Sequence, residues 1–105
     1  MMNLEQTATC MAELGHKTRL ALFRHLVKAG QKGLAVGELQ KQLNIPASTL
    51  SHHISRLTRA GLVVQERDGT TLICQPQYEV LQEMIDFLVS ECCSGETCIE
   101  TSCDC

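Results

Sequence analysis

The chain has 105 residues, a length that fits one small domain, and its 44% hydrophobic and 20% charged residues exclude a wholly disordered protein. Its formal net charge of -3 hides an asymmetry: residues 1–67 hold all nine lysines and arginines against four glutamates, and residues 68–105 hold eight acidic residues and no basic one. A uniformly acidic protein is therefore excluded, and the basic part permits a polyanionic partner.

Three amphipathic helices are predicted in the first half of the chain. Apolar residues recur at helical spacing over residues 4–15 and again over residues 18–30, and a glycine ends each pattern. A shorter helix is expected over residues 36–43. Pro46 disfavours helix at the residue before it and suits the start of a further helix, so we expect a tight turn between two helices.

The helix after this turn, which begins at Ala47 or Ser48, has two unlike faces. Leu50, Ile54 and Leu57 form an apolar face at helical spacing. The opposite face is polar and basic, and it carries Ser48, Ser51, His52, Ser55, Arg56 and Arg59. A short helix, a tight turn and a second helix with such a face are typical of a helix-turn-helix.

The chain then changes from helical to strand periodicity. Residues 62–67 and 70–74 are predicted as two strands, and Asp68-Gly69 between them is a strong signal for a two-residue hairpin turn. Such a hairpin is the wing that often follows a helix-turn-helix. The predicted fold class is therefore mainly α with a small β-hairpin, a winged helix-turn-helix.

A last helix is predicted from Tyr78 to near Cys92, where Ser94-Gly95 breaks the pattern. This organisation assigns residues 1–91 to a single winged helix-turn-helix domain. It leaves residues 92–105 as an acidic, cysteine-rich tail.

The start of the fourth helix carries the groups that DNA reading needs. Short polar side chains let a helix enter the major groove, and nearby donors bind phosphates and base edges. The predicted DNA contacts are Ser48, Thr49, Ser51, His52 and Arg56 on the helix and Arg67 and Thr70 on the wing. By itself, this polar helix face is as consistent with a face that only contacts solvent as with one that binds DNA. The turn before the helix and the hairpin after it favour DNA binding. The absence of Trp, with one Tyr and two Phe, disfavours RNA and single strands.

His53 follows His52 directly, and the two do not form a chelating pair. Adjacent positions on a helix point about 100° apart and do not face each other. We expect His53 to be a partly buried structural residue.

Several of these stretches resemble the ArsR (ArsR/SmtB) family of arsenic- and metal-sensing winged-helix repressors. They are Gly15-His16-Lys17-Thr18-Arg19-Leu20, the stretch from Leu39 through Pro46-Ala47-Ser48-Thr49-Leu50-Ser51-His52-His53-Ile54 to Ala60-Gly61-Leu62-Val63, and the Asp68-Gly69 wing. The resemblance covers most of residues 10–76. It implies a homodimer, joined by its first and last helices, that binds double-stranded operator DNA with an inverted repeat and releases it when an inducer binds. The residues expected at the dimer interface are Leu4, Met11, Tyr78, Leu81, Ile85 and Leu88.

The sequence departs from both common sensing sites of that family. Arsenic sensors often carry a Cys-Val-Cys pair on the first helix of the helix-turn-helix, where this chain has Ala-Val-Gly-Glu-Leu at residues 35–39. The paired histidine and acidic ligands of zinc sensors are missing too, because residues 77–93 contain no histidine. An inducer site must therefore lie elsewhere or be absent.

The chain also has an unusual number of cysteines. Its start lacks the basic-then-apolar pattern of a secretion signal, and no apolar run approaches the roughly 18 residues of a membrane span, so we predict a cytoplasmic protein without a membrane partner. In that compartment seven cysteines indicate metal or redox chemistry more than disulfides. Cys10 and Cys74 are expected to be buried, and the other five lie within residues 92–105.

Cys92, Cys93 and Cys98 are the predicted inducer ligands. Cys92 and Cys93 lie at the fraying end of the last helix, and Gly95 lets the chain double back to present Cys98. Three thiolates suit the pyramidal geometry of As(III), added as arsenite, or Sb(III). Neutral arsenous acid that exchanges hydroxyls for thiols adds no charge to an acidic tail.

Other uses of these cysteines stay open. Cys103 and Cys105 can complete a four-sulfur site for zinc, cadmium or lead, and the tail can also sense oxidation or be disordered with free or oxidised thiols. A thiol redox enzyme is disfavoured because no cation follows Arg67 to lower the pKa of a thiol.

Overall fold

A computed structural model describes residues 2–90 of the chain. Within this range lie the helices α1 (Leu4–Leu14), α2 (Lys17–Ala29), α3 (Val36–Leu43), α4 (Ala47–Arg59) and α5 (Tyr78–Val89) and the strands β1 (Leu34–Ala35), β2 (Val63–Asp68) and β3 (Thr71–Pro76). The strands form one antiparallel sheet in the order β1-β3-β2. The predicted winged helix-turn-helix is confirmed. Among the described helices, none is both long and apolar enough to cross a lipid bilayer.

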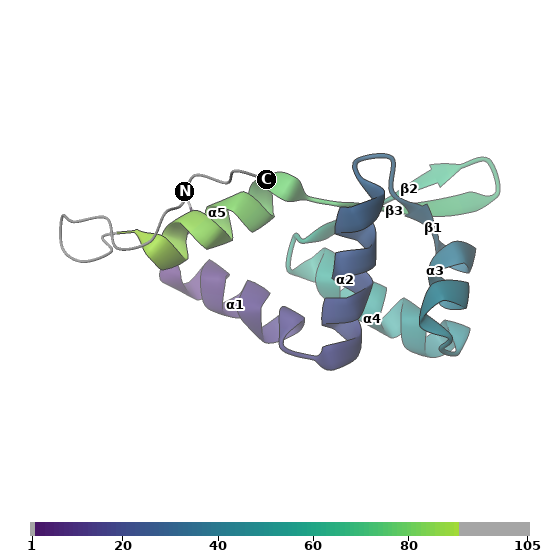
Figure 1. Ribbon diagram of the computed structural model, residues 1–105, viewed down its shortest axis with the longest axis horizontal. Helices are drawn as coiled ribbons and strands as arrows, with labels where there is room; N and C mark the ends of the chain where they lie inside the picture. The colour runs from purple at the N-terminus through teal and green to yellow at the C-terminus, as the bar shows by residue number, and fades with distance from the viewer. Residues whose placement is uncertain (1, 91–105) are drawn as a thin grey trace.

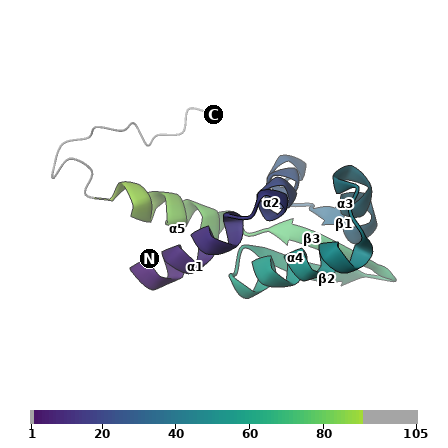
Figure 2. The same cartoon turned by 90° about the horizontal axis from the view of Figure 1, so that it is seen from below.

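The helices and the hairpin are arranged towards two opposite ends of the molecule (Figures 1 and 2). Helices α1 and α5 lie side by side at one end, and α3, the start of α4 and the tip of the β2–β3 hairpin lie at the other. Helix α2 stands between them. The hairpin is joined to the α1–α5 end through β3, which leads into α5 with only Gln77 between them.

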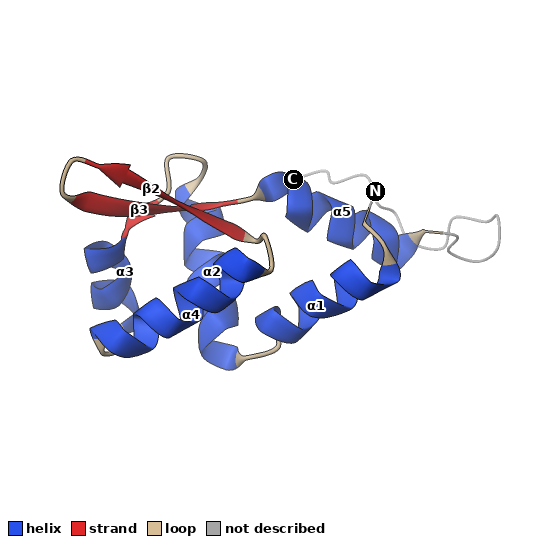
Figure 3. Cartoon of the chain, turned by 180° about the vertical axis from the view of Figure 1, so that it is seen from behind, coloured by secondary structure: helices blue, strands red, loops and turns tan. Residues whose placement is uncertain are grey.

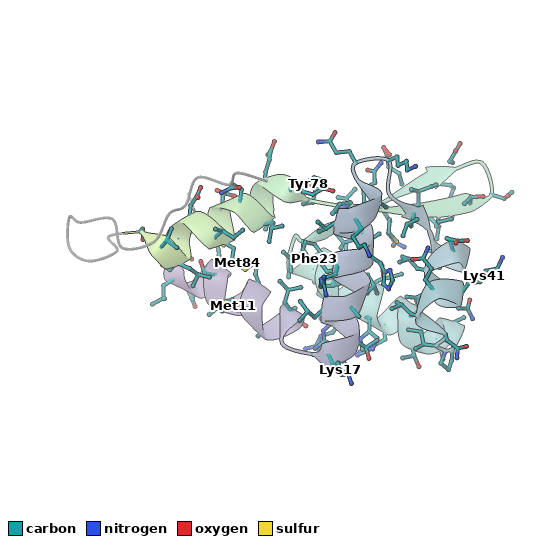
Figure 4. All side chains as sticks on the ribbon, in the orientation of Figure 1. Met11, Lys17, Phe23, Lys41, Tyr78 and Met84 are labelled. Carbon is teal, nitrogen blue, oxygen red and sulfur yellow. The ribbon has the colours of Figure 1, made fainter. Side chains whose placement is uncertain are left out.

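The core is built where the apolar faces of α2, α3 and α4 meet the sheet. Its fully buried members are Leu22, Leu26, Leu39, Leu50, Leu57, Leu62, Val63 and Cys74. Met84 extends this core to α5, from which it projects on the side of α1 (Figure 4). Each buried leucine contributes roughly 1.5–3 kcal/mol of burial free energy, so this cluster fixes the orientation of α4.

The helix ends follow local chemistry. Asn3 and Gln6 form a reciprocal capping box at the start of α1, in which the Asn3 side chain accepts a hydrogen bond from the Gln6 backbone N–H at 2.8 Å. His16 caps α2, since its Nδ1 accepts from the backbone N–H of Thr18. Helix α3 ends at Asn44, which takes a left-handed conformation with φ of 54°.

The sheet differs from the prediction in two respects. Strand β1 was missed, because two residues are too few to show a period; it exists through pairing of Leu34 with Cys74. The hairpin turn is also one residue later than predicted: Asp68 pairs with Thr71, so the turn residues are Gly69 and Thr70. Gly69 has φ of 66°, which glycine adopts without steric cost.

Helix α5 ends at Val89, earlier than the predicted end near Cys92. The predicted ligands Cys92, Cys93 and Cys98, and the alternatives Cys103 and Cys105, all lie outside the described residues. Cys10 and Cys74 are buried, as predicted. Burial raises the pKa of both thiols, which keeps them protonated and unreactive.

Candidate nucleic-acid interface

Helix α4 presents one face to the core and the other to solvent. Leu50, Ile54 and Leu57 are at most 2% exposed, so the packing fixes which way the helix faces. The exposed side chains are Ser48, Thr49, Ser51, His52, Ser55, Thr58 and Arg59. Four of the predicted DNA contacts, Ser48, Thr49, Ser51 and His52, are therefore gathered on the exposed side of the first two turns.

The hairpin lies at the same end of the molecule as the start of α4 (Figure 3). Arg67 and Thr70, the predicted wing contacts, are both exposed near its tip. Between α4 and the hairpin runs a groove of about 420 Å³, and its polar lining consists of Ser51, Ser55, Thr58, Arg59 and Gln65. The two elements thus form one continuous surface rich in hydrogen-bond donors.

Arg56 differs from the other predicted contacts, because its guanidinium binds a carboxylate of the same chain. Its Nε donates to Oε1 of Glu13 at 2.9 Å and its Nη2 donates to Oε2 at 3.3 Å. The Arg56 side chain is 40% exposed and that of Glu13 is 17% exposed. The hydrogen bond from Arg56 lowers the pKa of Glu13, and Glu13 in turn raises the pKa of Arg56.

A second arginine lies behind this ion pair. The Nε of Arg19, on α2, donates to the backbone carbonyl oxygen of Glu13 at 2.6 Å and lies 3.6 Å from Oε1 of the same residue. Its Nη1 lies 3.3 Å from Nδ1 of His53. Helices α1, α2 and α4 therefore meet in a single polar network, which we call the Glu13 network and define as Glu13, Arg19, His53 and Arg56.

The sequence by itself assigned no role to Glu13 or Arg19. A signal for Arg19 was present, because it lies three and four residues before Leu22 and Phe23, on the face of α2 that is buried. An arginine on such a face needs an acceptor. No comparable signal marks Glu13, whose partner lies 43 residues away along the chain.

His53 is 6% exposed, which confirms the expected burial. Its ring centroid lies 4.8 Å from that of His16 and 5.9 Å from that of His52. Burial, helped by the positive charges of neighbouring groups, lowers the pKa of His53. In the part of the chain that the structure describes, no three His, Cys, Asp or Glu side chains are placed to hold a metal ion.

The residues expected at a dimer interface fall into two groups. Leu4, Met11, Ile85 and Leu88 leave 73%, 47%, 42% and 55% of their surface exposed on α1 and α5. Tyr78 and Leu81 instead pack partly within their own protomer: the Tyr78 hydroxyl donates to the backbone carbonyl of Val27 at 2.8 Å, and Leu81 packs against the core.

Comparison with known proteins places this arrangement among DNA-binding regulators. The model of a helix-turn-helix domain family matches residues 14–66. A Halobacterium salinarum protein described as a putative arsenical resistance operon repressor is 38% identical over 66 residues, which are 63% of this chain and 50% of that relative. The chain thus spans about half the length of this curated relative.

Two solved structures extend the likeness. Reduced HlyU from Vibrio cholerae is 28% identical, with a TM-score of 0.65 over 85% of this chain and 90% of that one. A homodimeric winged helix-turn-helix DNA-binding domain from Mycobacterium bovis, described as a possible ArsR-family regulator, has a TM-score of 0.67 over 90% and 87% of the two chains. At 22% identity the latter is similar in fold alone. The Halobacterium relative is described as a repressor and the Mycobacterium domain as a possible transcriptional regulator, in agreement with the expectation of a regulator rather than an enzyme.

Proposed function

This chain belongs to the ArsR/SmtB family of winged helix-turn-helix transcriptional regulators, and on that premise we propose that it is a repressor whose homodimer binds operator DNA and is released by a thiophilic inducer. The observation that carries the proposal is the exposed polar side of α4 beside the hairpin. The residues assigned to DNA are Ser48, Thr49, Ser51 and His52 on α4 and Arg67 and Thr70 on the wing. Arg56 is not among them, because Glu13 binds its guanidinium.

In this proposal the first two turns of α4 enter the major groove. Short side chains at Ser48, Thr49 and Ser51 let the backbone approach the base edges, and their hydroxyls donate and accept hydrogen bonds. The hairpin brings Arg67 to the flanking phosphates. Charge favours this approach, since α4 contains no acidic residue and carries Arg59 beside the groove.

A homodimer is proposed from the exposed apolar surface of α1 and α5. Leu4, Met11, Ile85 and Leu88 are costly to leave in water, and a second copy of the same surface covers them by two-fold symmetry. The homodimeric domain from Mycobacterium bovis supports this arrangement. Two copies of α4 about one DNA turn apart, ~34 Å, would read both halves of an inverted repeat.

The proposed inducer is As(III), with Sb(III) as a chemically similar ligand, bound by Cys92, Cys93 and Cys98. Its support is the thiophilic character of trivalent arsenic and the description of the Halobacterium relative as an arsenical resistance operon repressor. These cysteines come soon after α5 in the sequence, and α5 contacts α1. A coupling of about 1–3 kcal/mol between inducer and DNA is typical of allosteric proteins.

The test begins with selection of a duplex from a random pool by the wild-type protein. Fluorescence anisotropy then follows release of that duplex as arsenite, antimonite, zinc, cadmium or peroxide is added at fixed salt. We expect release by arsenite and antimonite. Each of Cys92→Ser, Cys93→Ser and Cys98→Ser should abolish that release while DNA binding persists, with Cys103→Ser as the matched control that keeps it.

Other outcomes point to the other uses of the tail. Release by cadmium or zinc that needs Cys103 and Cys105 indicates a four-sulfur metal site. Release by peroxide that survives Cys98→Ser indicates a redox sensor. If a variant ending at Glu91 still releases the duplex when arsenite is added, the proposed inducer site is wrong.

A further inference from the structure

The ion pair between Glu13 and Arg56 joins helix α1 to helix α4, the proposed DNA-reading helix. Both contacts of the arginine go to the two oxygens of one carboxylate, at 2.9 and 3.3 Å. This two-pronged geometry is the one an arginine uses to bind a phosphate. The Nε–Nη2 edge of the guanidinium cannot face both acceptors at once, so Glu13 and a DNA phosphate compete for this edge of Arg56.

The surroundings of Glu13 favour the internal contact. The Glu13 side chain is largely shielded from solvent at 17% exposure, and the Nε of Arg19 lies 3.6 Å from Oε1, the oxygen that also accepts from the Nε of Arg56. The Arg19 Nε also donates to the Glu13 backbone carbonyl at 2.6 Å, which holds the end of α1 in place. The carboxylate is therefore both ionised and fixed in position before DNA arrives.

If Glu13 did not bind its guanidinium, Arg56 would reach DNA from its position on α4. It is four residues after His52 and seven after Thr49, so the three share one side of α4. Its side chain remains 40% exposed. An unpaired arginine at this place would add a phosphate contact that is independent of base sequence.

We propose that Glu13 limits the affinity of the protein for DNA of any sequence, because it binds the Nε–Nη2 edge of Arg56 and thereby keeps that edge from DNA phosphates. The inference rests on the proposed function of DNA binding. Arg56 is then a positioning residue: it orients α4 against α1 and adds nothing to phosphate binding. The affinity for every duplex then depends on the contacts of the first two turns of α4 and of the wing.

The experiment measures the salt dependence of DNA affinity for the wild type, Glu13→Gln, Arg56→Gln and the double variant. The probes are the duplex selected by the wild-type protein and a scrambled duplex of the same composition. For Glu13→Gln, the slope of log affinity against log salt should become steeper by about 0.9 per protomer. Between 50 and 200 mM salt this amounts to about 3.5-fold per protomer. The affinities for the selected and the scrambled duplex should rise alike, because a phosphate contact does not depend on base sequence.

The other two variants test whether the steeper salt slope depends on Arg56. Arg56→Gln alone should keep the wild-type slope, because the wild-type arginine contacts no phosphate. The double variant should also show the wild-type slope, since it has no arginine to release. A purely structural role for Glu13 would change stability without this dependence on Arg56, and thermal melts followed by circular dichroism separate the two effects.

Two results would overturn the inference. One is a slope for Arg56→Gln that is shallower by about 0.9 per protomer, which means that Arg56 already binds phosphate in the wild type. The other is an unchanged slope for a folded Glu13→Gln. If Glu13→Gln does not fold, the slope of Arg56→Gln decides alone. Failure of the wild-type protein to select any duplex would instead contradict the proposed function.

Discussion

The Nη1 atom of Arg19 lies 3.3 Å from Nδ1 of His53, inside the protein where α2 meets α4. A guanidinium can only donate hydrogen bonds, so the Nδ1 of His53 must accept, and the proton of the neutral ring lies on Nε2. Protonation of His53 would place an N–H against the guanidinium and a positive charge in a buried position. The contact therefore requires a neutral histidine.

This contact predicts that the protein loses stability as the pH falls through the range of histidine titration. The pKa of His53 is lowered in the folded state, mainly by burial. Below the ordinary histidine pKa of about 6.5, the unfolded chain takes up a proton that the folded chain does not. The free energy of unfolding should therefore decrease from that pH downward, until the pH reaches the lowered pKa.

Urea denaturation between pH 7.5 and 5.5 measures this effect. In His53→Asn, which keeps an acceptor near Arg19 and removes the titrating ring, the decrease over this range should be smaller than in the wild type. His25→Asn, on a part of α2 that lines a surface hollow with Arg24 and Lys28, is the matched control. Equal decreases in the wild type and His53→Asn would contradict the assignment.

Gly33 is predicted to be irreplaceable on steric grounds. It is buried with φ of 73°, and a methyl group added there would collide with the backbone carbonyl oxygen of Cys74 on β3. Gly33→Ala should lower the free energy of unfolding by about 1–3 kcal/mol. The control is Gly37→Ala within α3, where an added methyl meets nothing within 4 Å and should stabilise by about 0.5–1 kcal/mol. Chemical denaturation of both variants checks the opposite signs.

The proposed dimer predicts that a charge on α5 dissociates it. Leu88 is 55% exposed, so Leu88→Glu should leave the fold of the protomer intact. In the dimer that position becomes buried, and the variant should weaken association by about 30-fold or more, which corresponds to about 2 kcal/mol. Sedimentation equilibrium gives the dissociation constant. Leu20→Glu makes the same change on α2, at 45% exposure, and should have no such effect.

For the wing, we predict that loss of the Arg67 side chain changes the affinity for DNA without changing the preference for one DNA sequence over another. Arg67 is exposed near the hairpin tip and is proposed to bind phosphate. Arg67→Ala should weaken binding to selected and scrambled duplexes alike, and the salt slope should become shallower by about 0.9 per protomer. Ser51→Ala should instead keep the slope and lose about 1–3 kcal/mol of discrimination at one base pair. Loss of discrimination in Arg67→Ala would assign that side chain to base reading.

Local patterns in the sequence were sufficient to predict helices α1 to α5 and strands β2 and β3. The predicted helix over residues 36–43 matches α3, and the apolar face of α4 through Leu50, Ile54 and Leu57 is the buried one. Both follow from periodicity within a few turns of chain. Turn chemistry placed the hairpin to within one residue, because glycine fits either of the two turn positions.

Contacts between distant segments were decided by the tertiary structure alone. Strand β1 consists of two residues and exists only because β3 pairs with it. Glu13 and Arg56 are 43 residues apart, and Arg19 and His53 are 34 apart. No local period encodes such pairs. They arise because burial of the apolar faces of α2 and α4 brings the end of α1 against α4, and buried charges there must find partners.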